Sequence, residues 1–119
     1  MPRPSNPLLE QKLLDVGLGF LAERGEPKFS MREVAAAVGY TVTAVYRHYK
    51  SKEDFLVAMQ LFLFHQLNTK LSLLKGDNTR EQIEKIGEAF VIWGLSHPAY
   101  YRFMFQSTTL LKPADQPIA

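Results

Sequence analysis

The chain has 119 residues, a formal net charge of +2 and a hydrophobic fraction of 46%. This length allows one compact domain, or one small domain with part of another, and the apolar content is that of a folding chain. The absence of cysteine excludes disulfides and thiolate metal sites. No signal core or membrane span is recognisable, so we expect a soluble, cytoplasmic protein.

Apolar residues recur at helical spacing and no alternating strand pattern is present, which predicts an all-α fold. In chain order, helices are expected at about residues 7–24, 31–38, 42–49, 52–75, 80–96 and 98–108. The expected start signals are Asn6-Pro7, the capping box of Ser30 and Glu33, Thr41, the box of Ser51 and Asp54, the box of Thr79 and Gln82, and Pro98. Gly25 and Gly39 end the first two helices.

The apolar stripes predict which helix faces are buried. The expected inward residues are Leu9, Leu13, Val16 and Phe20 in the first helix, Met31, Val34, Ala35 and Val38 in the second, and Ile83, Ile86, Phe90 and Trp93 in the fifth. The fourth helix is apolar on more than one side and should have neighbours on several sides. Residues 111–119 have the composition of turns and disorder. We expect a first domain over residues 1–51, and a linking helix with part of a second domain over residues 52–119.

The segment from Phe29 to Phe55 has the layout of a helix-turn-helix motif, in which the second helix enters the major groove. The small Ala35 allows close helix packing, Gly39 permits the turn, and Ala44 and Val45 should face inward. The expected outward residues are Val42, Thr43, Tyr46, Arg47 and His48. Threonine, valine and arginine suit base edges, whereas tyrosine, histidine and lysine are good donors to phosphate.

Charge supports the same interpretation. Residues 39–52 contain Arg47, Lys50 and Lys52, and no acidic residue. Such a run creates local positive potential for a phosphate backbone. Lys52 also stands at a helix start, where exposed amides favour an anion.

Structural interpretations of these residues stay open. Tyr46 can pack against the first helix, His48 can be a partly buried structural residue, and Thr41 can act as a cap in addition to any base contact. Arg47 and the basic run are also compatible with an ordinary solvated face. The alternative for the whole chain is a helical protein–protein interaction module that does not bind DNA.

The segment LLDVGLGFLAERGEPKFSMREVAAAVGYTVTAVYRHYKSKEDFLVAM resembles the N-terminal domain of the TetR/AcrR family of transcriptional regulators. The resemblance covers roughly residues 8–59, and HPAYYRFMF at 97–105 resembles a helix junction of the same family. It implies a homodimeric regulator, usually a repressor, that binds a palindromic operator in double-stranded DNA and releases it when a small ligand binds. It implies base or groove contacts from Thr41, Val42, Thr43 and Arg47, and phosphate contacts from Tyr46, His48, Lys52 and Lys50.

Members of that family usually continue for several more helices, which form the dimer interface and complete the ligand pocket. This sequence is therefore interpreted as a fragment of a longer regulator or a natural short form, and dimerisation and induction are not carried over. Apolar effector contacts are assigned to Phe62, Phe90, Trp93, Tyr101 and Met104. A stripe at helical spacing is more often a plain core, and that interpretation stays open.

Catalytic chemistry is not expected. The three histidines are well separated and lack metal-ligand spacing, and no phosphate loop or nucleophile elbow is present. We therefore expect no enzyme activity, no metal, no cofactor and no membrane partner.

Overall fold

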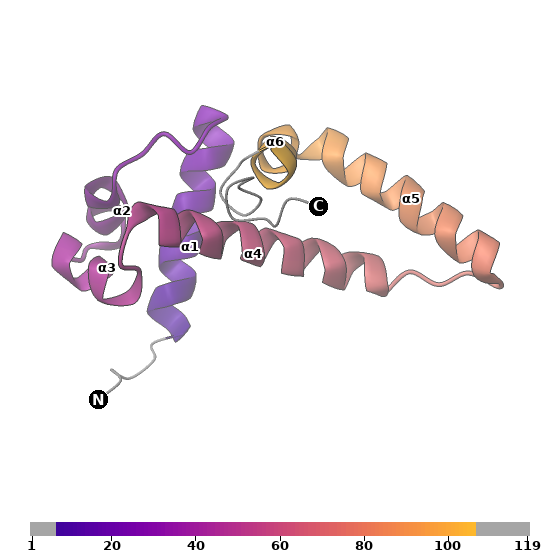
Figure 1. Cartoon of the computed structure of the whole chain (residues 1–119), viewed down its shortest axis with the longest axis horizontal. Coiled ribbons are helices and arrows are strands. Elements are labelled where there is room, and N and C mark those ends of the chain that lie inside the picture. The colour runs from indigo at the N-terminus through magenta and orange to yellow at the C-terminus, as the bar shows by residue number, and fades with distance from the viewer. Residues whose placement is uncertain (1–6, 107–119) are drawn as a thin grey trace, which may run out of the picture. The chain divides into compact units, whose positions relative to one another are not determined.

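The computed structural model describes residues 7–106, and every regular element in that range is an α-helix. The helices are α1 (Pro7–Arg24), α2 (Met31–Val38), α3 (Val42–His48), α4 (Lys52–Ser72), α5 (Thr79–Ser96) and α6 (Pro98–Gln106) (Figure 1). The all-α prediction is confirmed for this range. The expected cap at Asn6, the last two residues of the 98–108 helix and the tail at 111–119 lie outside the described residues.

The chain divides into two compact units, of which the first ends at Met59 and the second begins at Gln60. The division therefore falls inside α4, whereas the sequence places a domain boundary before that helix. No helix in the described range combines the length and the apolar character needed to cross a bilayer.

The first unit is a helix-turn-helix arrangement whose ends are fixed by local signals. Gly25 and Gly39 have φ of 75° and 85°, in the left-handed region that side chains other than glycine rarely enter. The hydroxyls of Ser30 and Thr41 accept hydrogen bonds of 3.1 Å from the backbone amides of Glu33 and Ala44. These contacts satisfy amides that the first turns of α2 and α3 leave without a helical partner. In Figure 1, α2 and α3 follow one another beside α1.

The core of the first unit contains at least one apolar side chain from each of its helices at zero exposure. These include Leu13 and Leu21 of α1, Val34 of α2, Val45 of α3, and Phe55 and Met59 of α4. In α1 the buried face also includes Gly17 and Leu18, whereas Val16 and Phe20, which the sequence predicts as inward, are only half-buried. The inward face of α1 is therefore rotated toward Leu21.

Gly17 lies where α1 faces side chains of α4. A Cβ atom at this position would lie 2.8 Å from two carbons of the Phe55 ring and 3.0 Å from the sulfur of Met59. A glycine therefore allows these two helices to meet directly behind the helix-turn-helix.

An ion pair joins the end of α1 to the start of α2. A nitrogen of the Arg24 guanidinium lies 2.7 Å from Oε2 of Glu33, and a second nitrogen donates to the carbonyl of Lys28. The Arg24 hydrogen bond, together with the charge of that residue and the backbone of Ser30, lowers the pKa of Glu33. The loop between α1 and α2 is thus held by polar contacts at the surface.

The linker between α4 and α5 corrects two sequence predictions. Helix α4 ends at Ser72, not near Lys75, because the Gln82 side chain engages the linker backbone: it accepts from the amide of Gly76 and donates to the carbonyl of Leu74 at 2.6 Å. The cap of α5 is Asn78, whose side chain accepts from the amide of Glu81 at 2.9 Å, and not Thr79. Gln82 therefore stabilises the linker instead of closing a capping box.

In the second unit, the buried apolar residues are Leu63, Leu67, Trp93, Phe103 and Met104. The buried Gln60 donates from Nε2 to the carbonyl of Phe103 at 3.1 Å, which ties α4 to α6. Of the stripe predicted in α5, Trp93 is buried but Ile83 is 63% exposed, because α6 packs near the other end of α5. The prediction for Ile83 is therefore wrong.

Candidate nucleic-acid interface

Helix α3 is anchored on one side and exposed on the other. Val45 has zero exposure and lies in the core of the first unit, whereas Thr43, Tyr46 and Arg47 are exposed. Tyr46 is 41% exposed, so the alternative in which it is buried against α1 is not what the structure shows. The three exposed residues recur at the spacing that places them on one side of a helix.

The remaining predicted contacts flank this side. Thr41 and Lys50 are exposed at the two ends of α3, and Val42 is half-buried in its first turn. The cap role of Thr41 is confirmed by its bond to the amide of Ala44. Tyr40, which is not among the predicted contacts, is 45% exposed in the turn between α2 and α3. An aromatic residue beside the turn glycine was the signal that could have identified it.

His48 does not look outward as predicted. Its side chain is 12% exposed, and Nδ1 lies 3.6 Å from Oε1 of Glu10 in α1. The physical reason is the helical spacing: His48 follows the fully buried Val45 by three positions and so lies near its side of α3, where the Glu10 carboxylate is available. The alternative of a partly buried histidine is the one that the structure supports.

Lys52 has a contact within the first unit. Its ammonium lies 4.8 Å from the centre of the Phe29 ring, in the geometry of a cation–π interaction. The residue is half-buried at the first position of α4, immediately after Ser51, whose hydroxyl accepts from the amide of Asp54 at 3.1 Å. The aromatic ring therefore holds the charge near the start of α4.

Tyr49, directly after α3, packs against a core residue of the first unit. Its ring packs edge-on against Phe55, with the ring centres 5.0 Å apart. Burial, and secondarily the charge of Glu10, raises the pKa of Tyr49 to about 12. The phenol therefore stays neutral at physiological pH and serves as a packing residue.

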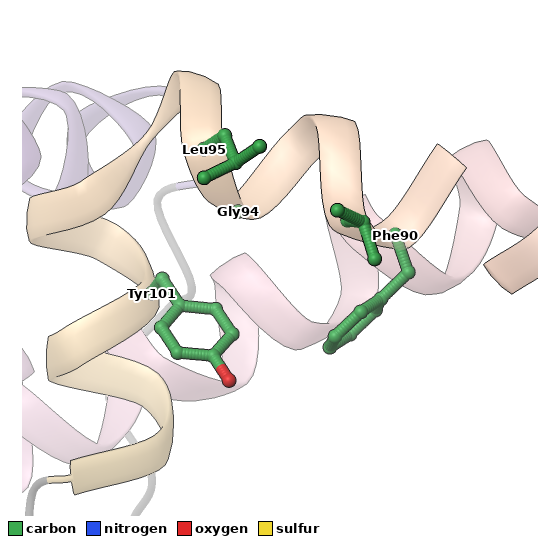
Figure 2. A pocket seen from close by; sticks show the side chains of 5 residues that line it. Phe90, Gly94, Leu95 and Tyr101 are labelled. Carbon is green, nitrogen blue, oxygen red and sulfur yellow. The ribbon is translucent and has the colours of Figure 1, made fainter. Parts of the chain in front are cut away.

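A separate apolar pocket lies in the second unit, between α5 and α6 (Figure 2). It has a volume of about 250 Å³ and is lined by Phe90, Val91, Gly94, Leu95 and Tyr101. Figure 2 shows the rings of Phe90 and Tyr101 on the two sides of the space between the helices, and their centres are 6.2 Å apart.

The predicted effector residues are only partly brought together by this pocket. Phe90 and Tyr101 line it, Trp93 and Met104 are buried in the core, and Phe62 is half-buried and outside the lining. Val91 and Leu95, which are more than half exposed, were not predicted. Hydrophobicity alone does not distinguish a pocket wall from a core position. Across residues 7–106, no three His, Asp or Glu side chains gather in a way that could hold a metal ion.

Comparison with known proteins places the first unit in context. Residues 13–59 match the family described as bacterial regulatory proteins, tetR family. The chain is also 22% identical over 109 residues to HTH-type transcriptional regulator Mb1846 of Mycobacterium bovis and to HTH-type transcriptional regulator Rv1816 of Mycobacterium tuberculosis. The similarity covers 88% of this chain and 47% of each relative, so the chain spans about half the length of the curated relatives it matches. No solved structure matches significantly.

The matched segment contains all of α2 and α3, most of α1 and the first part of α4. These are the elements that bury Val45 and leave the opposite side of α3 exposed. Residues 13–59, which form a helix-turn-helix domain, thus match the model of the TetR family of bacterial regulatory proteins.

Proposed function

We propose that the first unit binds double-stranded DNA and regulates transcription, with α3 in the major groove. The observation that carries this proposal is the two-sided character of α3: Val45 fixes it in the core, and Thr43, Tyr46 and Arg47 are presented to solvent. A reading helix needs a rigid scaffold behind it and polar side chains in front.

The proposed contacts divide into two chemical classes. Base edges are contacted by Thr41, Val42, Thr43 and Arg47, of which arginine can pair with guanine through two hydrogen bonds. Phosphates are contacted by Tyr46, Lys50 and Lys52, with His48 at the margin. Phosphate contacts fix the position of the protein on the duplex, and base contacts provide the sequence preference.

Electrostatics favours DNA at this surface. Residues 39–52 hold three cationic side chains without an acidic residue among them. Binding to DNA should therefore weaken steeply as salt rises. Each phosphate contact releases counterions from the DNA, and the entropy gained by that release is smaller when the bulk salt concentration is higher. Binding of an apolar protein partner, as in the interaction-module alternative, should change little with salt.

The test compares substitutions of the two contact classes. Lys52→Ala should weaken binding to every duplex and reduce the slope of log affinity against log salt by about 0.9, the value for one phosphate contact. Arg47→Ala should instead relax the preference at one base pair, at a cost of about 1–3 kcal/mol. Lys70→Ala is the matched control, because Lys70 is exposed on α4 in the second unit. If all three variants bind like the wild type at every salt concentration, α3 does not read DNA.

The finer proposal is a ligand-responsive repressor that acts as a homodimer. The repressor role and the homodimer are what the family resemblance implies. The ligand response is supported by the apolar pocket between α5 and α6, whose walls suit an aromatic or aliphatic small molecule. An environment-sensitive naphthalene dye serves as the probe. Leu95→Ser should reduce dye binding, and Leu73→Ser should not, because Leu95 lines the pocket whereas Leu73, similarly exposed, stands after the end of α4. Equal loss in both variants would indicate nonspecific adsorption.

A further inference from the structure

The contact between Glu10 and His48 places an acidic residue next to the reading helix. Oε1 of Glu10, in the first turn of α1, lies 3.6 Å from Nδ1 of His48, in the last turn of α3. The histidine side chain is 12% exposed and the glutamate side chain is 38% exposed. The pair is therefore partly shielded from water, and its interaction is less screened than that of a surface pair.

A carboxylate at this place is unexpected for a DNA-binding surface. A negative charge near the phosphate backbone repels it, and the motif itself contains no acidic residue between Gly39 and Lys52. If Glu10 acted only through its charge, its removal would strengthen DNA binding. A residue that improves binding despite its charge must act through the geometry of its neighbour.

The geometry points to Glu10 as a positioning residue of the DNA interface: by pairing with His48 it holds the last turn of α3 in the orientation that reads the groove. This inference rests on the proposed function. It goes beyond that function because it assigns a role to a residue in α1, outside the helix-turn-helix itself and outside the segment that matches the family.

The length of α3 explains why such a contact is needed. The helix has seven residues, and a helix this short is not stable without tertiary contacts. Its first turn is capped by Thr41 and its middle is anchored by Val45. Its last turn carries Arg47 and His48, and the Glu10 contact fixes this end against α1. A small rotation of this turn would move the Arg47 side chain away from a base edge.

Imidazole chemistry also allows His48 to connect two partners. The protonated ring has donors at both nitrogens. With Nδ1 directed to Glu10, the nitrogen on the other edge of the ring is available to a phosphate at the rim of the interface. The carboxylate would then orient the ring, as acidic residues orient histidines in other polar networks.

The experiment measures DNA affinity of the wild-type chain and of Glu10→Gln, at a temperature where circular dichroism shows both to be folded. Glu10→Gln should weaken binding by about fivefold, the size expected for the loss of one partly buried polar contact. Glu23→Gln is the matched control: it makes the same chemical change at an exposed position of α1 and should leave affinity equal or slightly higher. Glu10→Asp should recover part of the loss.

A double substitution tests whether Glu10 acts through His48. Glu10→Gln combined with His48→Ala should bind no more weakly than His48→Ala alone. Independent, multiplying losses would overturn the inference, as would unchanged or stronger binding by Glu10→Gln. If Glu10→Gln does not fold, His48→Gln breaks the pair from the other side and also removes the ring nitrogen assigned to a phosphate; unchanged binding by it overturns the inference. If the wild type binds no DNA, both the inference and the proposed function fail; if Lys52→Ala loses affinity and Glu10→Gln does not, only the inference fails.

Discussion

Substitution of Gly17 by alanine tests the packing that supports the helix-turn-helix. The new methyl group would lie 2.8 Å from carbons of the Phe55 ring, which is fully buried, and 3.0 Å from the sulfur of Met59. Because the ring cannot move into solvent, either α1 or α4 must shift. Overpacking of a core costs about 1–3 kcal/mol of unfolding free energy.

An opposing term comes from the backbone. Alanine in place of glycine within a helix stabilises it by about 1 kcal/mol. The two terms leave Gly17→Ala about 1 kcal/mol less stable than the wild type, taken near the middle of the overpacking range. Gly19→Ala has only the favourable term, since a Cβ at Gly19 meets nothing within 4 Å.

The assay is urea denaturation of both variants and the wild type, followed by circular dichroism. With a slope of about 1–3 kcal/mol per molar urea, the two midpoints should differ by about 1 M and should lie on opposite sides of the wild-type midpoint. The reasoning is refuted if Gly17→Ala is stabilised as much as Gly19→Ala. That result would mean that α1 and α4 are not in contact at this glycine.

Three further predictions concern caps and titrating groups. Thr41→Ala removes the cap of α3 and should cost about 1 kcal/mol in thermal unfolding, whereas Thr41→Ser should cost little. Arg24 lowers the pKa of Glu33 in the folded chain, so the ionised carboxylate contributes its full stability above the ordinary value of 4.5. That contribution is lost as pH falls through the lower folded pKa. Glu33→Gln should therefore lose less stability than the wild type in acid denaturation. The pKa of Tyr49 is raised to about 12, so the neutral phenol contributes its full stability below 10.0 and loses it as pH rises through 12. Tyr49→Phe should therefore resist alkaline unfolding better than the wild type. An equal alkaline midpoint in the two proteins would contradict the burial of the phenol.

The helix starts and turns of the first unit could be predicted because their causes are local. Ser30, Thr41 and Ser51 each accept a hydrogen bond from an amide three residues later. Gly39 adopts the positive φ that its place between two helical patterns requires. A capping residue and a turn glycine act within one turn of chain, so the sequence contains the whole interaction.

The sequence does not decide between two neighbouring residues that can both cap a helix. Asn78 and Thr79 are both good caps, and the choice between them depends on where Gln82 finds its partners in the linker. The sequence pattern also predicted Ile83 as buried, although it is 63% exposed, because periodicity gives a face but not the length over which a neighbour covers it.

The side-chain directions at the site depended on tertiary contacts. Arg47 and Tyr46 are exposed as expected from the helical spacing to Val45. His48, one position further, is turned to Glu10, and Lys52 lies over Phe29. Glu10 and Phe29 are distant in sequence from His48 and Lys52, and no local sequence pattern predicts such pairs.

The measurement that tests the central claim most directly is selection of binding sites from a random pool of duplex DNA at near-physiological salt, followed by sequencing. The account predicts an enriched short sequence, as a palindrome if the chain dimerises on DNA or as a single half-site if it does not, and loss of preference at one base pair in Arg47→Ala. Absence of any enrichment by a chain whose helices are shown to be folded, also after dimerisation is supplied by a fused coiled coil, would contradict it.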